Sequence, residues 1–332
     1  MGLCVLSECV ARASGGLQPY TAIFKFDPVV GYGYVTGQTV EFSQGPGRYR
    51  VAFDEDGVMD RSGTQPEAVV ILGDGIIAGL ELPRERRLAS LVAQKGGTSA
   101  VNLAVPGYGL LQEVLSLERW LQTHSKPRVV VVVQNFANDL IDNVPEWEES
   151  ASIPGIRRGS SSDFELIPPV LPSRAYQYVA NLAKTSRLYG TFQSRRSRPP
   201  MAGLPSQQMW LYAEKPPREI ERGLDALRGS GRRLRAIAEQ YRLAVIVFDW
   251  VDWPLLWRAV DAPLAKQHLA RTRVQQATGF RSHPLEELVP SLPPDVVTWD
   301  QRWIIEPNRH ANAAAVSAVS DAIVCRLKLT DE

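Results

Sequence analysis

Residue types that could support chemistry are concentrated in four short segments of the chain. The segments read GDGIIAG at 73–79, NLAVPGYG at 102–109, FANDL at 136–140 and PNRHAN at 307–312. They contain carboxylate, amide and imidazole side chains, the groups that hydrogen-bond to ligands or transfer protons. Glycines beside them allow tight turns and close approach of the backbone to a ligand. These four segments are therefore the first candidates for a functional site.

The first segment is also compatible with a nucleotide-binding turn, because glycines after a strand can approach a pyrophosphate. Pro83 delays the next helix, so the N-terminus of that helix cannot lie directly on a phosphate. The second apolar run ends in NLA at 102–104, without an acidic residue for a ribose. We therefore expect no nucleotide cofactor. Gly73 and Gly79 by themselves would indicate only a turn.

The positions of apolar runs show which elements must hold these segments. Continuous apolar runs predict strands at 68–72, 100–105, 128–134 and 243–248, with a weaker candidate at 296–299. Helical periodicity predicts helices at 83–94, 110–122, 174–189, 216–241, 262–276 and 311–329. Strands that alternate with helices are typical of a parallel sheet covered on both faces. Ligands of such sheets bind beyond the carboxyl ends of the strands, where three of the segments lie.

Two further regions differ from this alternating pattern. Residues 1–66 are rich in Gly, Tyr and Val with frequent turn signals, which predicts a β-rich N-terminal extension before an α/β domain at 67–332. Residues from about 141 to 215 are irregular and contain paired prolines and a serine run. We interpret this stretch as an insertion, either a lid or a docking segment for a partner protein.

Together the four segments resemble, in order and spacing, the sequence blocks of the SGNH (GDSL-type) hydrolases. The resemblance implies a flavodoxin-like, three-layer α/β/α fold with a central parallel sheet. In that family the first block provides a serine nucleophile, and glycine and asparagine of the next two blocks complete an oxyanion hole. The last block provides an acid and a histidine base. By position, the resemblance assigns these roles to Gly107, Asn138 and His310.

The chain departs from the family pattern at two places. Gly75 occupies the position of the nucleophilic serine, so no hydroxyl is available there for an acyl-enzyme. Pro307 and Asn308 stand where the acid is usual, which leaves Glu306 as the nearest carboxylate before the histidine. Without an acid, the histidine lacks its usual orienting partner. Two losses together favour natural divergence, a pseudoenzyme, over a laboratory Ser→Gly knockout.

Aromatic residues near the expected site could bind the substrate. Trp250 and Trp253 follow the strand at 243–248, and Trp303 precedes the last block. Such faces could stack on a sugar ring or an aromatic acyl group, although a tryptophan taken singly is more often a core residue than part of a pocket. Asp74 and Tyr108, which lie within the blocks, are further substrate-binding candidates.

The amino-acid composition limits the classes of ligand and partner that we expect. Lys and Arg total 37 against 36 Asp and Glu, so no strong field favours nucleic acid. Apolar runs are too short to cross a bilayer, and the amino terminus lacks the pattern of a signal peptide, which makes a cytoplasmic location the default expectation. Cys4, Cys9 and Cys325 have no metal-ligand spacing. We expect no metal and no cofactor, and a small-molecule ester or glycan as ligand.

Four functions are compatible with the sequence. The chain could bind an acyl-bearing ligand without hydrolysing it. His310 could instead activate a water in the space left by the serine hydroxyl. The chain could be a Ser→Gly form of an active esterase, which restoring the serine would reveal. A non-enzymatic alternative is a protein-binding module that uses the insertion.

Overall fold

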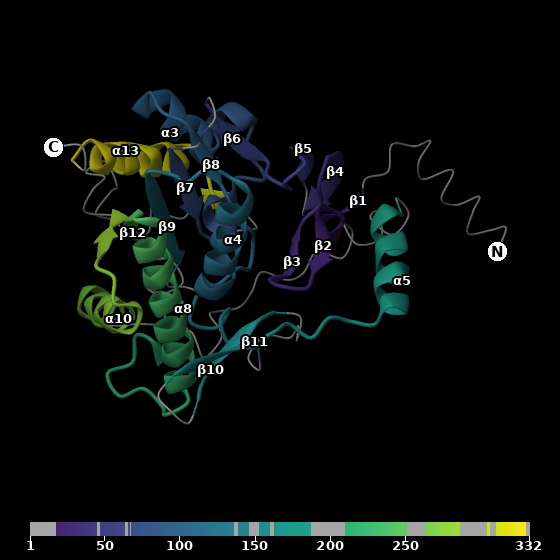
Figure 1. Cartoon of the computed structure of the whole chain (residues 1–332). Coiled ribbons are helices and arrows are strands. Elements are labelled where there is room, and N and C mark those ends of the chain that lie inside the picture. The colour runs from purple at the N-terminus through teal and green to yellow at the C-terminus, as the bar shows by residue number, and fades with distance from the viewer. Residues whose placement is uncertain are drawn as a thin grey trace.

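A six-stranded sheet forms the centre of the computed structural model (Figure 1). The structure describes residues 18–44, 47–63, 66, 68–135, 139–145, 153–159, 163–186, 210–250, 263–285, 304–305 and 310–329. In spatial order the sheet contains β13 (Ser282–Pro284), β12 (Ala244–Trp250), β9 (Val129–Asn135), β7 (Val69–Leu72), β8 (Ala100–Asn102) and β6 (Asp60–Ser62). β6 is antiparallel to β8, and every other neighbouring pair is parallel.

The order of the parallel strands confirms the flavodoxin-like fold. Numbered along the chain, the five parallel strands lie in the spatial order 2-1-3-4-5, the doubly wound order of flavodoxin-like proteins. The run of five valines in β9 is buried along its whole length, as expected for a strand covered on both faces. The order reverses between β7 and β9, and ligands of such sheets bind at this switch point.

Two groups of helices cover the sheet (Figure 1). α3 (Leu88–Gly96) packs against α13 (Ala313–Leu329), and α8 (Ile220–Tyr241) packs against both α4 (Leu110–Thr123) and α10 (Pro263–Thr278). These five helices agree with the predicted ones to within a few residues, apart from the start of α3. None of the helices that the structure describes has the length and apolarity needed to span a membrane.

The predicted helix at 83–94 is divided in the structure. A short 3-10 helix, η2 (Arg84–Arg86), is followed by α3, which begins at Leu88. Arg87 between them has extended backbone angles (φ −79°, ψ 160°). Its side chain turns inward and donates hydrogen bonds to the Gly79 and Leu82 carbonyl oxygens. The helical period of residues 83–94 reflects only the spacing of apolar residues within the segment. It therefore does not predict the contact that the Arg87 side chain makes with the preceding turn.

The N-terminal region contains several short strands and one 3-10 helix. These are β1 (Gln18–Pro19), η1 (Tyr20–Ile23), β2 (Phe24–Asp27), β3 (Gly31–Tyr34), β4 (Gln38–Gln44) and β5 (Gly47–Phe53). β6 also lies in the predicted extension, yet it pairs with β8 and forms the edge of the central sheet. The extension is thus continuous with the α/β sheet, and its boundary at residue 66 stays a prediction.

The insertion contains a hairpin and a helix among its described residues. β10 (Gly155–Arg158) and β11 (Phe164–Ile167) pair antiparallel, and α5 (Arg174–Thr185) lies beside η1 and β1 (Figure 1). The sequence predicted the helix, but with an end at residue 189 and without the hairpin. Whether the insertion acts as a lid or as a docking segment stays a prediction.

The fifth parallel strand differs from the one expected. It is β13, which pairs with the carboxyl end of β12 at Val247–Ser282, Phe248–His283 and Asp249–Pro284. The sequence prediction placed this strand at 296–299, a stretch that lies outside the described residues. Ser282–Pro284 has little strand propensity, and its place in the sheet depends on pairing with a distant segment.

Candidate active site

The first block forms a turn from β7 into a single helical turn, α2 (Gly75–Ala78). Asp74 is the N-cap, and its Oδ1 accepts a hydrogen bond from the Ile76 N–H at 2.9 Å. Such a cap satisfies one of the backbone donors left free at a helix start. A Cβ atom at Gly73 would lie 2.6 Å from Ile77 Cδ1, so a larger residue there would require the Ile77 side chain to move. Gly75 is therefore held at the N-terminus of α2, directly beyond the carboxyl end of β7.

The third block is attached to the first through Asn135, the last residue of β9. Its side-chain Nδ2 donates to Asp74 Oδ2 at 2.9 Å. Its backbone N–H donates to Asp139 Oδ2 at 2.9 Å, and its carbonyl oxygen accepts from the Asp139 N–H at 3.0 Å. These bonds join Asp139 to the end of β9, and the end of β9 to Asp74 at the start of α2. Asn138 lies outside the described residues, so its assigned role stays a prediction.

The second block is held against the first by its backbone and by one side chain. The Val105 N–H donates to the Gly73 carbonyl oxygen at 3.2 Å. Asn102 Nδ2 donates to the Ile77 carbonyl oxygen at 2.8 Å, and its Oδ1 accepts from the Ala104 N–H. Asn102 thus bonds both to α2 and to the loop that leads to Gly107. It belongs to the sequence motif, but the motif did not predict this positioning function.

Gly107 occupies a position that disfavours a side chain for two reasons. Its φ of +77° lies in the left-handed region, which non-glycine residues rarely adopt. A Cβ atom there would also lie 2.7 Å from the Tyr32 hydroxyl oxygen. That hydroxyl donates to the Pro106 carbonyl oxygen at 2.9 Å, which holds it in place. The N-terminal extension therefore supports the backbone of the second block.

The last block also meets the first. The short strand β15 (His310–Ala311) pairs antiparallel with β14 (Ile304–Ile305), with His310 opposite Ile305. β15 is in contact with α2, the helix that begins at Gly75. The structure thus brings the backbone of His310 to the side of the sheet where Gly75 and Asp74 lie. Glu306, the nearest carboxylate in the chain before this histidine, lies outside the described residues.

Buried carboxyl groups lie close to the blocks. Glu113 on α4 is 2% exposed, and neither of its carboxylate oxygens has a hydrogen-bond partner in the described part of the chain. Burial, together with the charges of Asp74 and Asp142, raises the pKa of Glu113 well above its ordinary value. Burial and the Glu113 charge likewise raise the pKa of Asp139. The environment of Glu113 therefore favours the neutral form of its carboxyl group more than water does. In the sequence, Glu113 stands out as an acidic residue on the apolar face of an amphipathic helix.

The predicted substrate-binding residues are buried where the structure describes them. Trp250 pairs with Asn135 across β12 and β9 and is 8% exposed. The Tyr108 hydroxyl donates to the Tyr32 carbonyl oxygen, and both carboxylate oxygens of Asp74 accept hydrogen bonds from the protein. These contacts give all three residues structural partners, and their contact with a ligand stays a prediction. Trp253 and Trp303 lie outside the described residues.

The described part of the site is organised by hydrogen bonds. No cluster of three or more His, Cys, Asp or Glu able to hold a metal occurs among the described residues. Three blocks converge on α2 at the switch point of the sheet, a place where backbone N–H groups can face a ligand. Gly75, which the sequence resemblance places at the position of the nucleophile, can contribute its backbone to such a site but has no side chain that could attack a substrate.

No protein-family model matches the chain, and no curated protein matches it either. Several solved structures do resemble it. The lipase/acylhydrolase from Enterococcus faecalis is 12% identical, with coverage of 80% of this chain and 97% of that chain and a TM-score of 0.40. A carbohydrate esterase family 2 enzyme from Corynascus thermopiles is 15% identical, with coverage of 81% and 68% and a TM-score of 0.38.

A third solved structure belongs to a protein of the lipolytic G-D-S-L family from Veillonella parvula. It is 9% identical, with coverage of 79% of this chain and 97% of that chain and a TM-score of 0.34. Identities and TM-scores this low transfer no activity or substrate to this chain.

Proposed function

We propose that this chain is a divergent member of the SGNH (GDSL-type) superfamily that binds an acyl or ester group and has lost serine hydrolysis. The observation that carries the proposal is the convergence on α2. Asn135 at the end of β9 bonds both to Asp74 and to Asp139 of the third block, the second block bonds to Gly73, and the strand that contains His310 contacts α2. Blocks far apart in the chain are thus held around Gly75, which has no side chain.

The chemistry that this arrangement can still perform is binding of a polarised carbonyl. Backbone N–H groups at Gly75 and Gly107, with the Asn138 amide, would act as donors to the carbonyl oxygen, as in an oxyanion hole. A covalent acyl-enzyme requires a nucleophilic oxygen or sulfur, which glycine does not provide. The ligand in this proposal is an ester or acyl group on a small molecule or a glycan, and no cofactor takes part.

The test compares the natural chain with Gly75→Ser and the matched variant Gly75→Ala. Burst kinetics on p-nitrophenyl acetate report an acyl-enzyme, and a fluorophosphonate probe labels an activated serine. We expect no burst and no labelling for the natural chain and for Gly75→Ala. A burst from the natural chain would overturn the proposal. Strong activity restricted to Gly75→Ser would show an intact esterase site that lacks only its hydroxyl.

Binding is tested separately from hydrolysis. Saturation-transfer NMR on the natural chain can compare an acetylated oligosaccharide with its deacetylated form. We expect contact with the acetyl group only, and a loss of that signal in Gly107→Ala, which disturbs the second block. Equal signals from both sugars would contradict an acyl-directed site.

A second candidate function is slow hydrolysis by a water molecule. The contact of the His310 strand with α2 favours it, because the histidine belongs to a segment that adjoins Gly75. General-base assistance contributes about 10²- to 10⁴-fold to such a step. The natural chain would then hydrolyse p-nitrophenyl acetate without a burst, and His310→Ala would abolish that rate. An unchanged rate in His310→Ala would exclude this mechanism.

A further inference from the structure

A cavity of about 710 Å³ lies between the N-terminal strands and the loop that follows α2. Its walls come from β5, β6 and residues 80–87. Arginines dominate its charged lining: Arg48, Arg50, Arg61, Arg84 and Arg87. The acidic residues in that lining are Asp54 and Glu81. The volume is within the usual range for small-molecule sites, about 300–1,000 Å³.

Arg87 is the most unusual member of this lining, because it is a buried cation. It is 5% exposed. Its Nε donates to the Gly79 and Leu82 carbonyl oxygens at 3.2 and 3.0 Å, and its Nη1 donates to the Met59 carbonyl oxygen at 2.8 Å. Its Nη2 has no hydrogen-bond partner among the described residues. Buried charges in proteins are normally paired or bind a ligand.

No carboxylate of the described chain forms an ion pair with Arg87. The nearby Asp60 accepts hydrogen bonds from the Ala89 and Ser90 N–H groups and from the Ser90 hydroxyl instead. Burial lowers the pKa of Arg87, and the charge of Asp60 opposes this effect only in part. The free energy of burying this guanidinium is therefore only partly offset within the protein.

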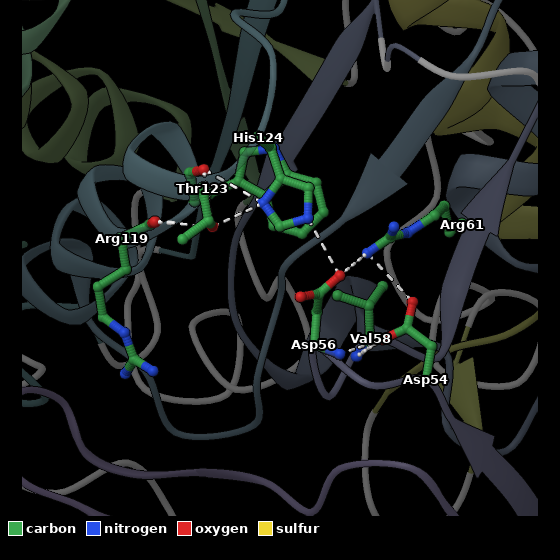
Figure 2. Close-up of polar contacts among 8 residues, drawn as sticks. Asp54, Asp56, Val58, Arg61, Arg119, Thr123 and His124 are labelled. Atoms are coloured by element: carbon green, nitrogen blue, oxygen red, sulfur yellow. Dashed lines mark hydrogen bonds and ion pairs between the residues drawn. The ribbon is translucent and has the colours of Figure 1, made fainter.

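Arg61, in contrast, is already neutralised. Its Nη2 lies 3.1 Å from Asp54 Oδ2 and 2.6 Å from Asp56 Oδ2, and Figure 2 shows it between the two carboxylates. Asp56 also contacts His124 Nε2 at 3.1 Å. Arg61 and Asp54 thus cancel one another in the lining, and the positive charge of the cavity comes from the other arginines.

The remaining arginines have weak acidic partners or none. Arg84 on η2 donates from Nη2 to the Arg61 carbonyl oxygen at 3.0 Å and forms no ion pair within the described residues. Arg48 on β5 has no ion pair within the described residues. Arg50 approaches Glu41 at 3.6 Å, but both side chains are largely exposed, and such pairs are weak.

We propose that this cavity binds a small organic anion through its carboxylate, phosphate or sulfate groups, with Arg87 at the base and Arg84 and Arg48 at the rim. Guanidinium groups suit these oxyanions because their planar N–H pairs match two oxygens at once. The site is distinct from the acyl site, and its ligand need not be hydrolysed. The two are physically linked, since Arg87 bonds to the carbonyl oxygen of Gly79, the C-cap of α2.

Isothermal titration calorimetry on the full chain tests this proposal with four probes: inorganic phosphate, sulfate, trigalacturonate and the uncharged sugar maltotriose. We expect heat of binding from the anions and none from maltotriose. Trigalacturonate alone would identify an anionic sugar, whereas phosphate or sulfate alone would identify a smaller anion. Binding should weaken as NaCl is raised from about 0.05 M to about 0.5 M, because salt screens partly exposed charges.

Three variants make the test specific. Arg84→Gln should weaken binding at least about tenfold, the effect of one lost charge-assisted hydrogen bond. Arg86→Gln is the matched control, because Arg86 is an exposed residue of the same helix η2 and does not line the cavity. It should leave the affinity unchanged. Arg87→Lys should weaken binding too, and circular dichroism establishes that it is folded.

Two outcomes would overturn the proposal. One is the absence of binding by every anionic probe to the natural chain. The other is an equal loss of affinity in Arg84→Gln and Arg86→Gln, which would show a general effect of surface charge. Neither outcome depends on ester hydrolysis. The proposed acyl site is therefore tested separately, by the experiments described under the proposed function.

Discussion

Asn135 and Asp74 are joined by a hydrogen bond of 2.9 Å between the amide Nδ2 and the carboxylate Oδ2. Asn135 is the last residue of β9, and Asp74 follows β7. The strand order of the sheet reverses between these two strands. Both are buried, at 5% and 4% exposure, so the bond lies in an environment of low dielectric. This contact joins the end of β9 to the residue that caps α2, the helix that begins at Gly75.

A double-mutant cycle measures the strength of that contact. We expect Asn135→Ala to lower the free energy of unfolding by about 1–3 kcal/mol, because Asp74 would keep a buried oxygen without its partner. Asp74→Ala also removes the cap of α2, so its own loss should be larger. The coupling between the two changes, measured by urea unfolding, should be about 1 kcal/mol or more. Purely additive losses would mean that the bond contributes nothing.

Gly107→Ala tests the close approach of the N-terminal extension to the second block. The change requires a left-handed non-glycine residue, which costs about 1–2 kcal/mol, and a displacement of the Tyr32 hydroxyl. Gly97→Ala is the matched control, since Gly97 has φ +59° and a Cβ atom added there would have no neighbouring atom within 4 Å. Unfolding measurements should show the larger loss at Gly107. Equal losses would indicate that Tyr32 moves aside at no cost.

Glu113→Gln tests the buried carboxyl next to the blocks. The folded-state pKa of Glu113 is raised, so the stability that its proton provides is present below the ordinary value of 4.5 and is lost as the pH rises. Gln cannot lose a proton. The stability of the variant relative to the natural chain should therefore increase from pH 4 to pH 8. The increase should be about 1.4 kcal/mol for each pH unit over which Glu113 is protonated in the folded chain and ionised in the unfolded chain.

The control for this experiment is Glu239→Gln, at an exposed position on α8. Its stability relative to the natural chain should stay nearly constant over the same pH range. A flat difference for Glu113→Gln as well would show that Glu113 is ionised in the folded chain. Urea unfolding curves at several pH values provide both comparisons.

The polar contacts at the end of β12 have a structural role that can be measured. Asp249 is 0% exposed and accepts hydrogen bonds from Arg271 Nε and Nη2 at 2.8 and 2.9 Å and from the Ser282 hydroxyl. Arg271→Gln should lower the free energy of unfolding by about 3–5 kcal/mol, because it leaves a buried carboxylate without its cation.

The exposed pair Arg157–Glu165 is a control for that change. Its side chains are 65% and 57% exposed, and its Nη2–Oε2 distance is 2.9 Å. Arg157→Gln should cost no more than about 1 kcal/mol in thermal or urea unfolding, since solvent screens such pairs. Similar losses for Arg157→Gln and Arg271→Gln would contradict the role given to burial.

Local sequence patterns were sufficient for much of the architecture. The valine run of β9 and the alternation of apolar runs with amphipathic helices predicted the parallel sheet. The same patterns placed the blocks at strand ends, where Asp74 and Gly107 are found. These features can be recognised in the sequence because each kind of burial produces a local pattern. A strand buried on both faces is a continuous apolar run, and a helix buried on one face has apolar residues at the helical period.

Other features were decided only by the tertiary structure. Asn135 bonds to Asp74 across 61 positions of the chain, and Ser282–Pro284 becomes a strand only by pairing with β12. Arg87 ends one helix and precedes another because its guanidinium reaches carbonyl oxygens of distant turns. Such contacts form between segments that meet only when the chain is folded, so the local pattern of apolar and polar residues does not predict them. The sequence determined most of the central strands and helices and the order of the candidate residues along the chain, and long-range packing decided the remaining elements and which of those residues meet.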